Sequence, residues 1–117
     1  MKLSEVRDVL KAEVITGGDR MDTIITGGGG ADLMGDVLSA ATKGAVLLTG
    51  LNTEKVIQTA QVAGVGAIVF VRGKRPSAAM IEIAESFSMP TMTTRYSLFV
   101  ASGRLYMNGL RGLDGSW

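Results

Sequence analysis

The side chains that could do chemistry in this chain are limited in kind. The 117 residues include no histidine and no cysteine. Histidine is the commonest general base and metal ligand, and cysteine supplies thiolate nucleophiles, disulfides and metal–sulfur bonds. Any base would have to be Asp, Glu or Lys, and no nucleophile motif stands beside one. We therefore expect a protein that is not an enzyme and that holds no metal.

Cations gather in two of the expected loops. Three lie between residues 72 and 75, and Arg95 follows a later strand. The carboxyl ends of parallel strands and the N-termini of the next helices meet at one edge of a sheet, where anions bind. The sequence therefore predicts a site for a small anion such as phosphate or an adenine nucleotide. The alternative is ordinary helix capping with solvated cations. The candidate ligand-binding residues are Gly50, Asn52, Thr53, Arg72, Gly73, Lys74, Arg75, Ser77, Thr93, Thr94 and Arg95.

Two further motifs invite a functional interpretation. Residues 27–30 are four glycines between a strand and a helix, but they lack the continuation of a phosphate-binding loop. We interpret them as a flexible connector. Asp32 and Asp36 are spaced to share one side of a helix, as paired carboxylates that bind a cation would be. Asp32 is better placed as the N-cap of that helix, and no third ligand accompanies the pair.

The elements that must position these residues alternate regularly. Strands are expected at 13–16, 22–26, 45–49, 67–71 and 91–93, and helices at 5–11, 32–41, 52–63, 77–87 and 96–101. Ser4, Asn52 and Ser77 are expected N-caps, and Gly103 is expected to end the last helix. Apolar strands separated by helices predict an α/β fold, a layered and mostly parallel β-sheet with helices on both faces.

Composition favours self-association. Hydrophobic residues make up 46% of the chain and the mean hydropathy is +0.28, which is high for a small domain. The alternative is a core rich in glycine and alanine. The candidate dimer interface, which could equally close the monomer core, is Tyr96, Phe99, Leu105, Tyr106 and Met107.

The net charge and the targeting signals limit the classes of partner and the cellular location that we expect. A net charge of +1 argues against nucleic acid. The apolar runs are too short to cross a bilayer, and the N-terminus lacks the apolar stretch of a signal peptide. We expect a cytoplasmic location and poor order in the last few residues.

Three segments together resemble the DRTGG domain family. They are residues 47–53, 69–76 and 89–99, and the stretches 1–6 and 31–38 look like stand-alone members. The family's Asp-Arg pair falls on Asn52-Thr53, and its Thr-Gly-Gly falls on Val71-Arg72-Gly73. The literal Asp19-Arg20 lies out of frame, in a turn.

The resemblance implies a fold like the N-terminal domain of HPr kinase/phosphatase, which dimerises. We expect residues 1–117 to form a single DRTGG-type domain, a non-catalytic regulatory or scaffold module that homodimerises and binds a small anion such as an adenine nucleotide. One alternative is a ligand-free partner of an enzyme it regulates, in a redox or hydrogenase-type system. The other is a phosphoryl-transfer enzyme, but no Gly-Lys-Ser or Gly-Lys-Thr phosphate loop occurs.

Overall fold

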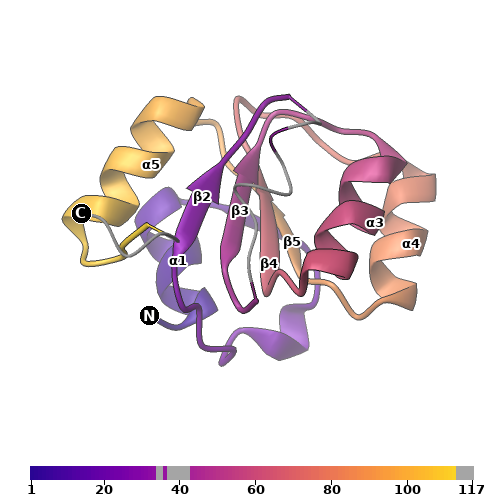
Figure 1. The fold of residues 1–117 in the computed structure, drawn as a ribbon, viewed down its shortest axis with the longest axis horizontal. Helices are drawn as coiled ribbons and strands as arrows, with labels where there is room; N and C mark the ends of the chain where they lie inside the picture. The colour runs from indigo at the N-terminus through magenta and orange to yellow at the C-terminus, as the bar shows by residue number, and fades with distance from the viewer. Residues whose placement is uncertain (34–35, 37–42, 113–117) are drawn as a thin grey trace.

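The chain folds around a central five-stranded sheet with the strand order β1-β5-β4-β3-β2 (Figure 1). The computed structural model describes residues 1–33, 36 and 43–112. The strands are β1 (Glu13–Thr16), β2 (Gly28–Gly30), β3 (Val46–Thr49), β4 (Ala67–Phe70) and β5 (Thr91–Thr93). The last four run parallel, and β1 pairs with β5 in the antiparallel direction. The predicted α/β class and mostly parallel sheet are confirmed.

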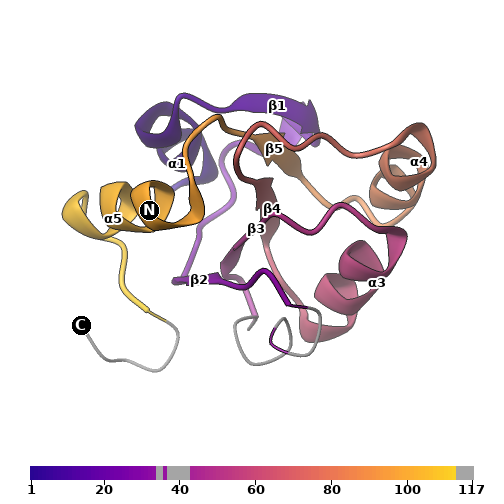
Figure 2. The same ribbon diagram turned by 90° about the horizontal axis from the view of Figure 1, so that it is seen from above.

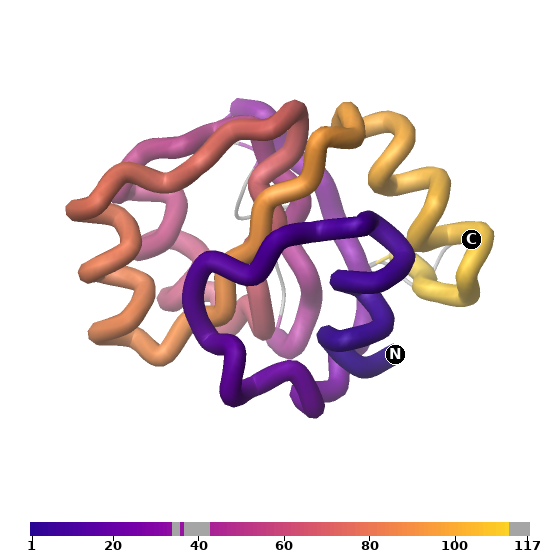
Figure 3. Tube along the Cα trace, turned by 180° about the vertical axis from the view of Figure 1, so that it is seen from behind, coloured from indigo at the N-terminus to yellow at the C-terminus, as the bar shows by residue number. Residues whose placement is uncertain are grey.

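Helices cover both faces of this sheet. Helices α1 (Leu3–Leu10) and α5 (Leu98–Met107) lie on one face, and α3 (Glu54–Ala63) and α4 (Ala78–Ser86) lie on the other (Figure 2). Figure 3, seen from behind, shows the N-terminal and C-terminal helices side by side. No helix in the described part of the chain is long and apolar enough to cross a membrane.

The central strands are buried because their side chains alternate between two cores. Val46 and Leu48 of β3 face the core under α1 and α5, whereas Leu47 faces the core under α3 and α4. Strand β4 alternates in the same way, with Val69 on the first side and Phe70 on the second. Both faces of the sheet are therefore apolar, which explains the continuous apolar runs in the sequence.

Two sequence-based assignments near the N-terminus are wrong. Residues 22–26 form no strand, and only Ile24 makes an isolated bridge, to Lys2. The supposed glycine connector instead contains the edge strand β2. A Cβ at Gly30 would lie 2.7 Å from Leu98 of α5, and one at Gly28 would lie 3.0 Å from Leu110. Glycine fits here because the side chains of Leu98 and Leu110 pack directly against the strand backbone, and a larger residue would force them to shift.

Some helix boundaries were predicted correctly and others were not. Ser77 is confirmed as the N-cap of α4, since its hydroxyl accepts a bond from the Met80 N–H at 3.2 Å. Helix α1 is capped by Lys2 rather than Ser4, and α3 begins after Thr53 rather than Asn52. Helix α5 does not end at Gly103 but continues to Met107. The predicted helix at 32–41 falls largely outside the described residues. The last five residues fall outside them entirely.

Candidate functional site

Polar side chains meet where β2, β3 and β4 end. Asp32 follows β2, Gly50 follows β3, and Arg72 lies just beyond β4. The Asp32 carboxylate accepts a hydrogen bond from the Gly50 backbone N–H at 2.6 Å through Oδ1, and one from Arg72 Nη1 at 2.9 Å through Oδ2. One carboxylate thus joins three loops at the carboxyl edge of the sheet, and we call this group the Asp32 cluster.

The main chain at Arg72, whose side chain supplies one of the two donors to Asp32, is held by the backbone around it. Arg72 and Gly73 both have left-handed φ values, 57° and 68°. Their N–H groups donate to the carbonyls of Tyr96 and Thr94, each at 2.8 Å. Gly50 allows the guanidinium to approach, because a Cβ at this position would overlap Nη2 of Arg72. A side chain at residue 50 would therefore displace the guanidinium from the position in which it donates to Asp32.

The electrostatics of the Asp32 cluster favour the charged carboxylate. The hydrogen bond from Arg72, and after it the N–H of Gly50, lower the pKa of Asp32 below its ordinary value of 3.8. Asp32 is therefore ionised at neutral pH. Both of its oxygens accept hydrogen bonds from the neighbouring loops, and the helix that it was expected to cap lies largely outside the described residues.

A second ion pair lies further along the same edge. The Arg75 guanidinium donates two bonds to Glu13, at 3.1 Å and 2.8 Å, and both side chains are exposed. The arginine lowers the pKa of Glu13, and the carboxylate raises that of Arg75. Glu13 opens β1 directly opposite Thr93 of β5, which is how an antiparallel strand brings an acid to this edge.

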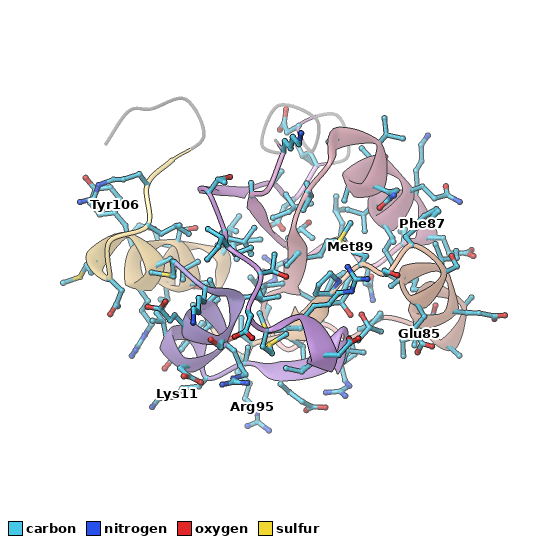
Figure 4. The ribbon with its side chains drawn as sticks, turned by 90° about the horizontal axis from the view of Figure 1, so that it is seen from below. Lys11, Glu85, Phe87, Met89, Arg95 and Tyr106 are labelled. Carbon is cyan, nitrogen blue, oxygen red and sulfur yellow. The ribbon has the colours of Figure 1, made fainter. Side chains whose placement is uncertain are left out.

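Beside this pair is a polar hollow of about 290 Å³, which we call the edge hollow. The hydroxyls of Thr93 and Thr94 donate to the Lys74 and Leu10 carbonyls, at 2.6 Å and 2.7 Å. The hydroxyl hydrogens of these two threonines are therefore already used in bonds that stabilise the loops. Lys11 and Arg95 are at the same end of the molecule (Figure 4). The lining residues are Lys11, Glu13, Gly73, Arg75, Thr93, Thr94 and Arg95.

The predicted ligand-binding residues therefore separate into groups. Gly50 and Arg72 belong to the Asp32 cluster, and five others line the edge hollow. Ser77 is a helix cap, Thr53 caps α3 without a side-chain bond, and the Asn52 amide lies 3.5 Å from the Arg75 carbonyl. Lys74 is exposed, and its carbonyl accepts the bond from Thr93. Sequence reasoning missed Asp32, Lys11 and Glu13 as members, since only the strand order brings them to this edge.

The predicted interface residues also separate. Phe99 and Met107 are 88% and 87% exposed, and Tyr106 is partly exposed. Leu105, by contrast, is only 2% exposed and packs in the core under α5. Tyr96 packs against the same core, and the Arg104 guanidinium lies 4.4 Å from the centre of its ring. Only part of the predicted set is therefore exposed on the surface of one chain.

The fold and the edge define a small α/β domain with two carboxylate–arginine pairs at the carboxyl ends of its parallel strands. Within the described ranges, no three acidic side chains lie close enough together to hold a metal ion. The sequence matches the DRTGG domain over residues 5–107, so the chain belongs to the DRTGG domain family. No curated protein matches the sequence significantly.

A solved structure shares this fold. It is the crystal structure of the CBS and DRTGG domains of the regulatory region of Clostridium perfringens pyrophosphatase, complexed with the activator diadenosine tetraphosphate. The TM-score is 0.69 at 19% identity, and the match covers 89% of this chain and 45% of the other. This chain thus spans less than half of that regulatory region.

Proposed function

We propose that this DRTGG domain is a non-catalytic regulatory or scaffold module that acts as a homodimer and binds a small anionic ligand such as an adenine nucleotide. The observation that carries the proposal is the outer face of α5. We define this face as Phe99, Val100, Gly103, Tyr106 and Met107, which lie on one side of the helix by their spacing.

Helix α5 is apolar on two opposite sides. Ala101 and Leu105 are buried against the sheet, while Phe99, Tyr106 and Met107 are exposed. A helix that is apolar all round normally has both sides covered. Helix α3 lacks this feature, because its exposed residues are mostly polar: Glu54, Lys55, Gln58 and Gln61, with Val62 as the exception. The outer face of α5 therefore favours a partner, and α3 does not.

Gly103 indicates which partner fits. A Cβ at Gly103 would meet no atom of the described residues within 4 Å, so packing among these residues does not require glycine there. Glycine inside a helix costs about 1 kcal/mol relative to alanine. A second α5 crossing at Gly103 would use that space and would place Phe99 and Met107 of each chain against the other. Such a contact uses the same patch twice, as twofold homodimers do.

The ligand part of the proposal is supported by the carboxyl edge. The Arg72 guanidinium and the Gly50 N–H converge on one carboxylate there, and a guanidinium beside a backbone N–H is suitable chemistry for phosphate. The Clostridium perfringens regulatory region, which shares the fold, is complexed with a nucleotide activator. The non-catalytic part is supported by the residue types, since the chain has neither histidine nor cysteine.

Light scattering on the full chain tests the dimer. We expect wild type to have twice the mass of one chain at micromolar concentration. The double variant Phe99→Glu, Met107→Glu should have the mass of one chain, because charges would be buried in the interface. Val62→Glu is the matched control, because Val62 is 84% exposed on α3. A monomeric wild type, or dissociation by Val62→Glu alone, would contradict the proposal.

Thermal unfolding with ATP, ADP, AMP or phosphate tests the ligand part. Millimolar ligand should raise the melting temperature by a few degrees, because binding to the folded state stabilises it. If none of the four changes the melting temperature, the ligand part is wrong and a ligand-free scaffold remains.

A further inference from the structure

We propose that the Asp32 carboxylate is an internal anion occupying the phosphate site of this domain, and that a ligand binds by displacing it from Gly50 and Arg72. The inference rests on the proposed function, since it assigns the place and the chemistry of the anionic ligand. The ligand class is a phosphate or phosphate ester with two negative charges.

The first support is the set of donors that Asp32 occupies. A backbone N–H and a guanidinium converge on its oxygens, at 2.6 Å and 2.9 Å, from loops that follow two adjacent parallel strands. A peptide N–H together with arginine is a common arrangement for binding phosphate oxygens. The carboxylate therefore stands where the anionic oxygens of a ligand would stand.

The second support is that the main chain carrying Arg72 does not depend on Asp32 for its position. The main chain of Arg72 and Gly73 is tied to Tyr96 and Thr94, and the Val71 N–H donates to the Thr49 carbonyl at 2.9 Å. These bonds would remain if Asp32 moved away. The main chain of the site therefore loses little conformational entropy when a ligand binds, and the Arg72 guanidinium only has to exchange Asp32 for the ligand.

The third support is that Asp32 can be displaced. The Arg72 and Asp32 side chains are 45% and 36% exposed, so a solute can reach both. Ion pairs this exposed contribute little to stability. A phosphate dianion carries more charge than a carboxylate and has three acceptor oxygens, so it would compete well for the same donors.

The Glu13–Arg75 pair provides a matched comparison. It is also a carboxylate–arginine pair at this edge, and it is likewise exposed. However, its bonds join two side chains, and the Glu13 carboxylate has no backbone N–H partner among the described residues. Removing the Glu13 charge should therefore change the net charge without uncovering a phosphate site.

Calorimetric titration of the full chain with inorganic phosphate, and separately with ADP, tests the inference. Asp32→Asn should bind phosphate about tenfold more tightly than wild type, equivalent to about 1.4 kcal/mol. Asp32→Ala, which removes the competing side-chain oxygens, should show at least the same gain. Glu13→Gln should stay within about twofold of wild type, as expected for a general charge effect at moderate salt. Adding Arg72→Ala to Asp32→Asn should abolish the gain.

The outcomes separate this inference from the proposed function. If wild type binds ADP and neither Asp32 variant binds phosphate or ADP more tightly, the inference is overturned and ligand binding stands. An equal gain from Glu13→Gln also overturns it, because the effect would be general electrostatics. If no variant binds phosphate or ADP at millimolar concentration, both the inference and the ligand part of the proposed function fail. Melting temperatures measured in parallel establish that each variant is folded.

Discussion

The outer face of α5 and the carboxyl edge of the sheet differ in whether their side chains have partners. On α5, large apolar groups such as Phe99 and Met107 project into solvent without a partner in the described chain. At the edge, two arginines are each paired with a carboxylate, Arg72 with Asp32 and Arg75 with Glu13. The apolar groups of α5 thus remain without a partner among the described residues, whereas the charged groups at the edge are already paired with each other.

This difference indicates how each region would bind. An exposed apolar face gains free energy as soon as a second face covers it, so association there needs no rearrangement. A paired carboxylate has to be displaced first, so an anion must compete for Arg72. Self-association should therefore be the stronger and less selective event, and ligand binding should be the weaker and more adjustable one.

The largest expected effect separates the two sides of α5. Leu105→Ala removes a fully packed side chain and should lower the free energy of unfolding by about 2–5 kcal/mol. Phe99→Ala should leave the unfolding of the isolated monomer almost unchanged, because Phe99 is exposed there. Urea unfolding measures Leu105→Ala in the Phe99→Glu, Met107→Glu background, which we expect to be monomeric, and Phe99→Ala in the Met107→Glu single variant at a concentration at which light scattering gives the mass of one chain. Similar losses for Leu105→Ala and Phe99→Ala in the isolated monomer would mean that the two sides of α5 are not distinct.

The central strands could be predicted from the sequence because they are continuous apolar runs. Residues 45–48 and 67–71 are buried and all apolar, as expected for strands covered on both faces. Ser77 was also predictable, because a cap acts on its own helix within three residues. Local signals of this kind need no knowledge of the neighbouring elements.

The glycine strand and the Asp32 cluster could not be predicted in this way. Strand β2 has no side chains to show a pattern, and it is defined by Leu98 and Leu110 packing against it. Asp32 bonds to residues 18 and 40 positions further along the chain, and only the order β2-β3-β4 brings them together. In the sequence, Leu105 and Phe99 are both apolar residues of one terminal segment. Only the orientation of α5 shows that Leu105 is buried and Phe99 is exposed.

A smaller effect should appear at Gly103. In the Phe99→Glu, Met107→Glu background, Gly103→Ala should raise the free energy of unfolding by up to about 1 kcal/mol, because alanine is the better helix former. In the otherwise wild-type chain the same substitution should weaken the dimer, since the added methyl group would separate the crossing helices. Sedimentation equilibrium measures the second effect. An unchanged dissociation constant would place the crossing point away from Gly103.

The smallest effect concerns pH and the Asp32 cluster. Arg72 and the Gly50 N–H lower the pKa of Asp32 in the folded chain below its ordinary value of 3.8. The unfolded chain therefore binds the proton more readily, and stability rises with pH through this window. The contribution of Asp32 is present above its ordinary pKa and is lost as the pH falls through the lowered value. We expect less than about 1 kcal/mol, because the pair is exposed and screened.

Urea unfolding of wild type and Asp32→Asn between about pH 2 and 6 measures this contribution. The two stabilities should differ most at the upper end and converge toward the lower end, since wild type loses the charge that the variant never had. Added salt should reduce the difference, because Arg72 and Asp32 attract each other across solvent-exposed space. Curves that stay parallel over the whole range would show that the Asp32 charge does not stabilise the three loops. The carboxyl edge would then owe its order to the backbone bonds of residues 71–73 alone.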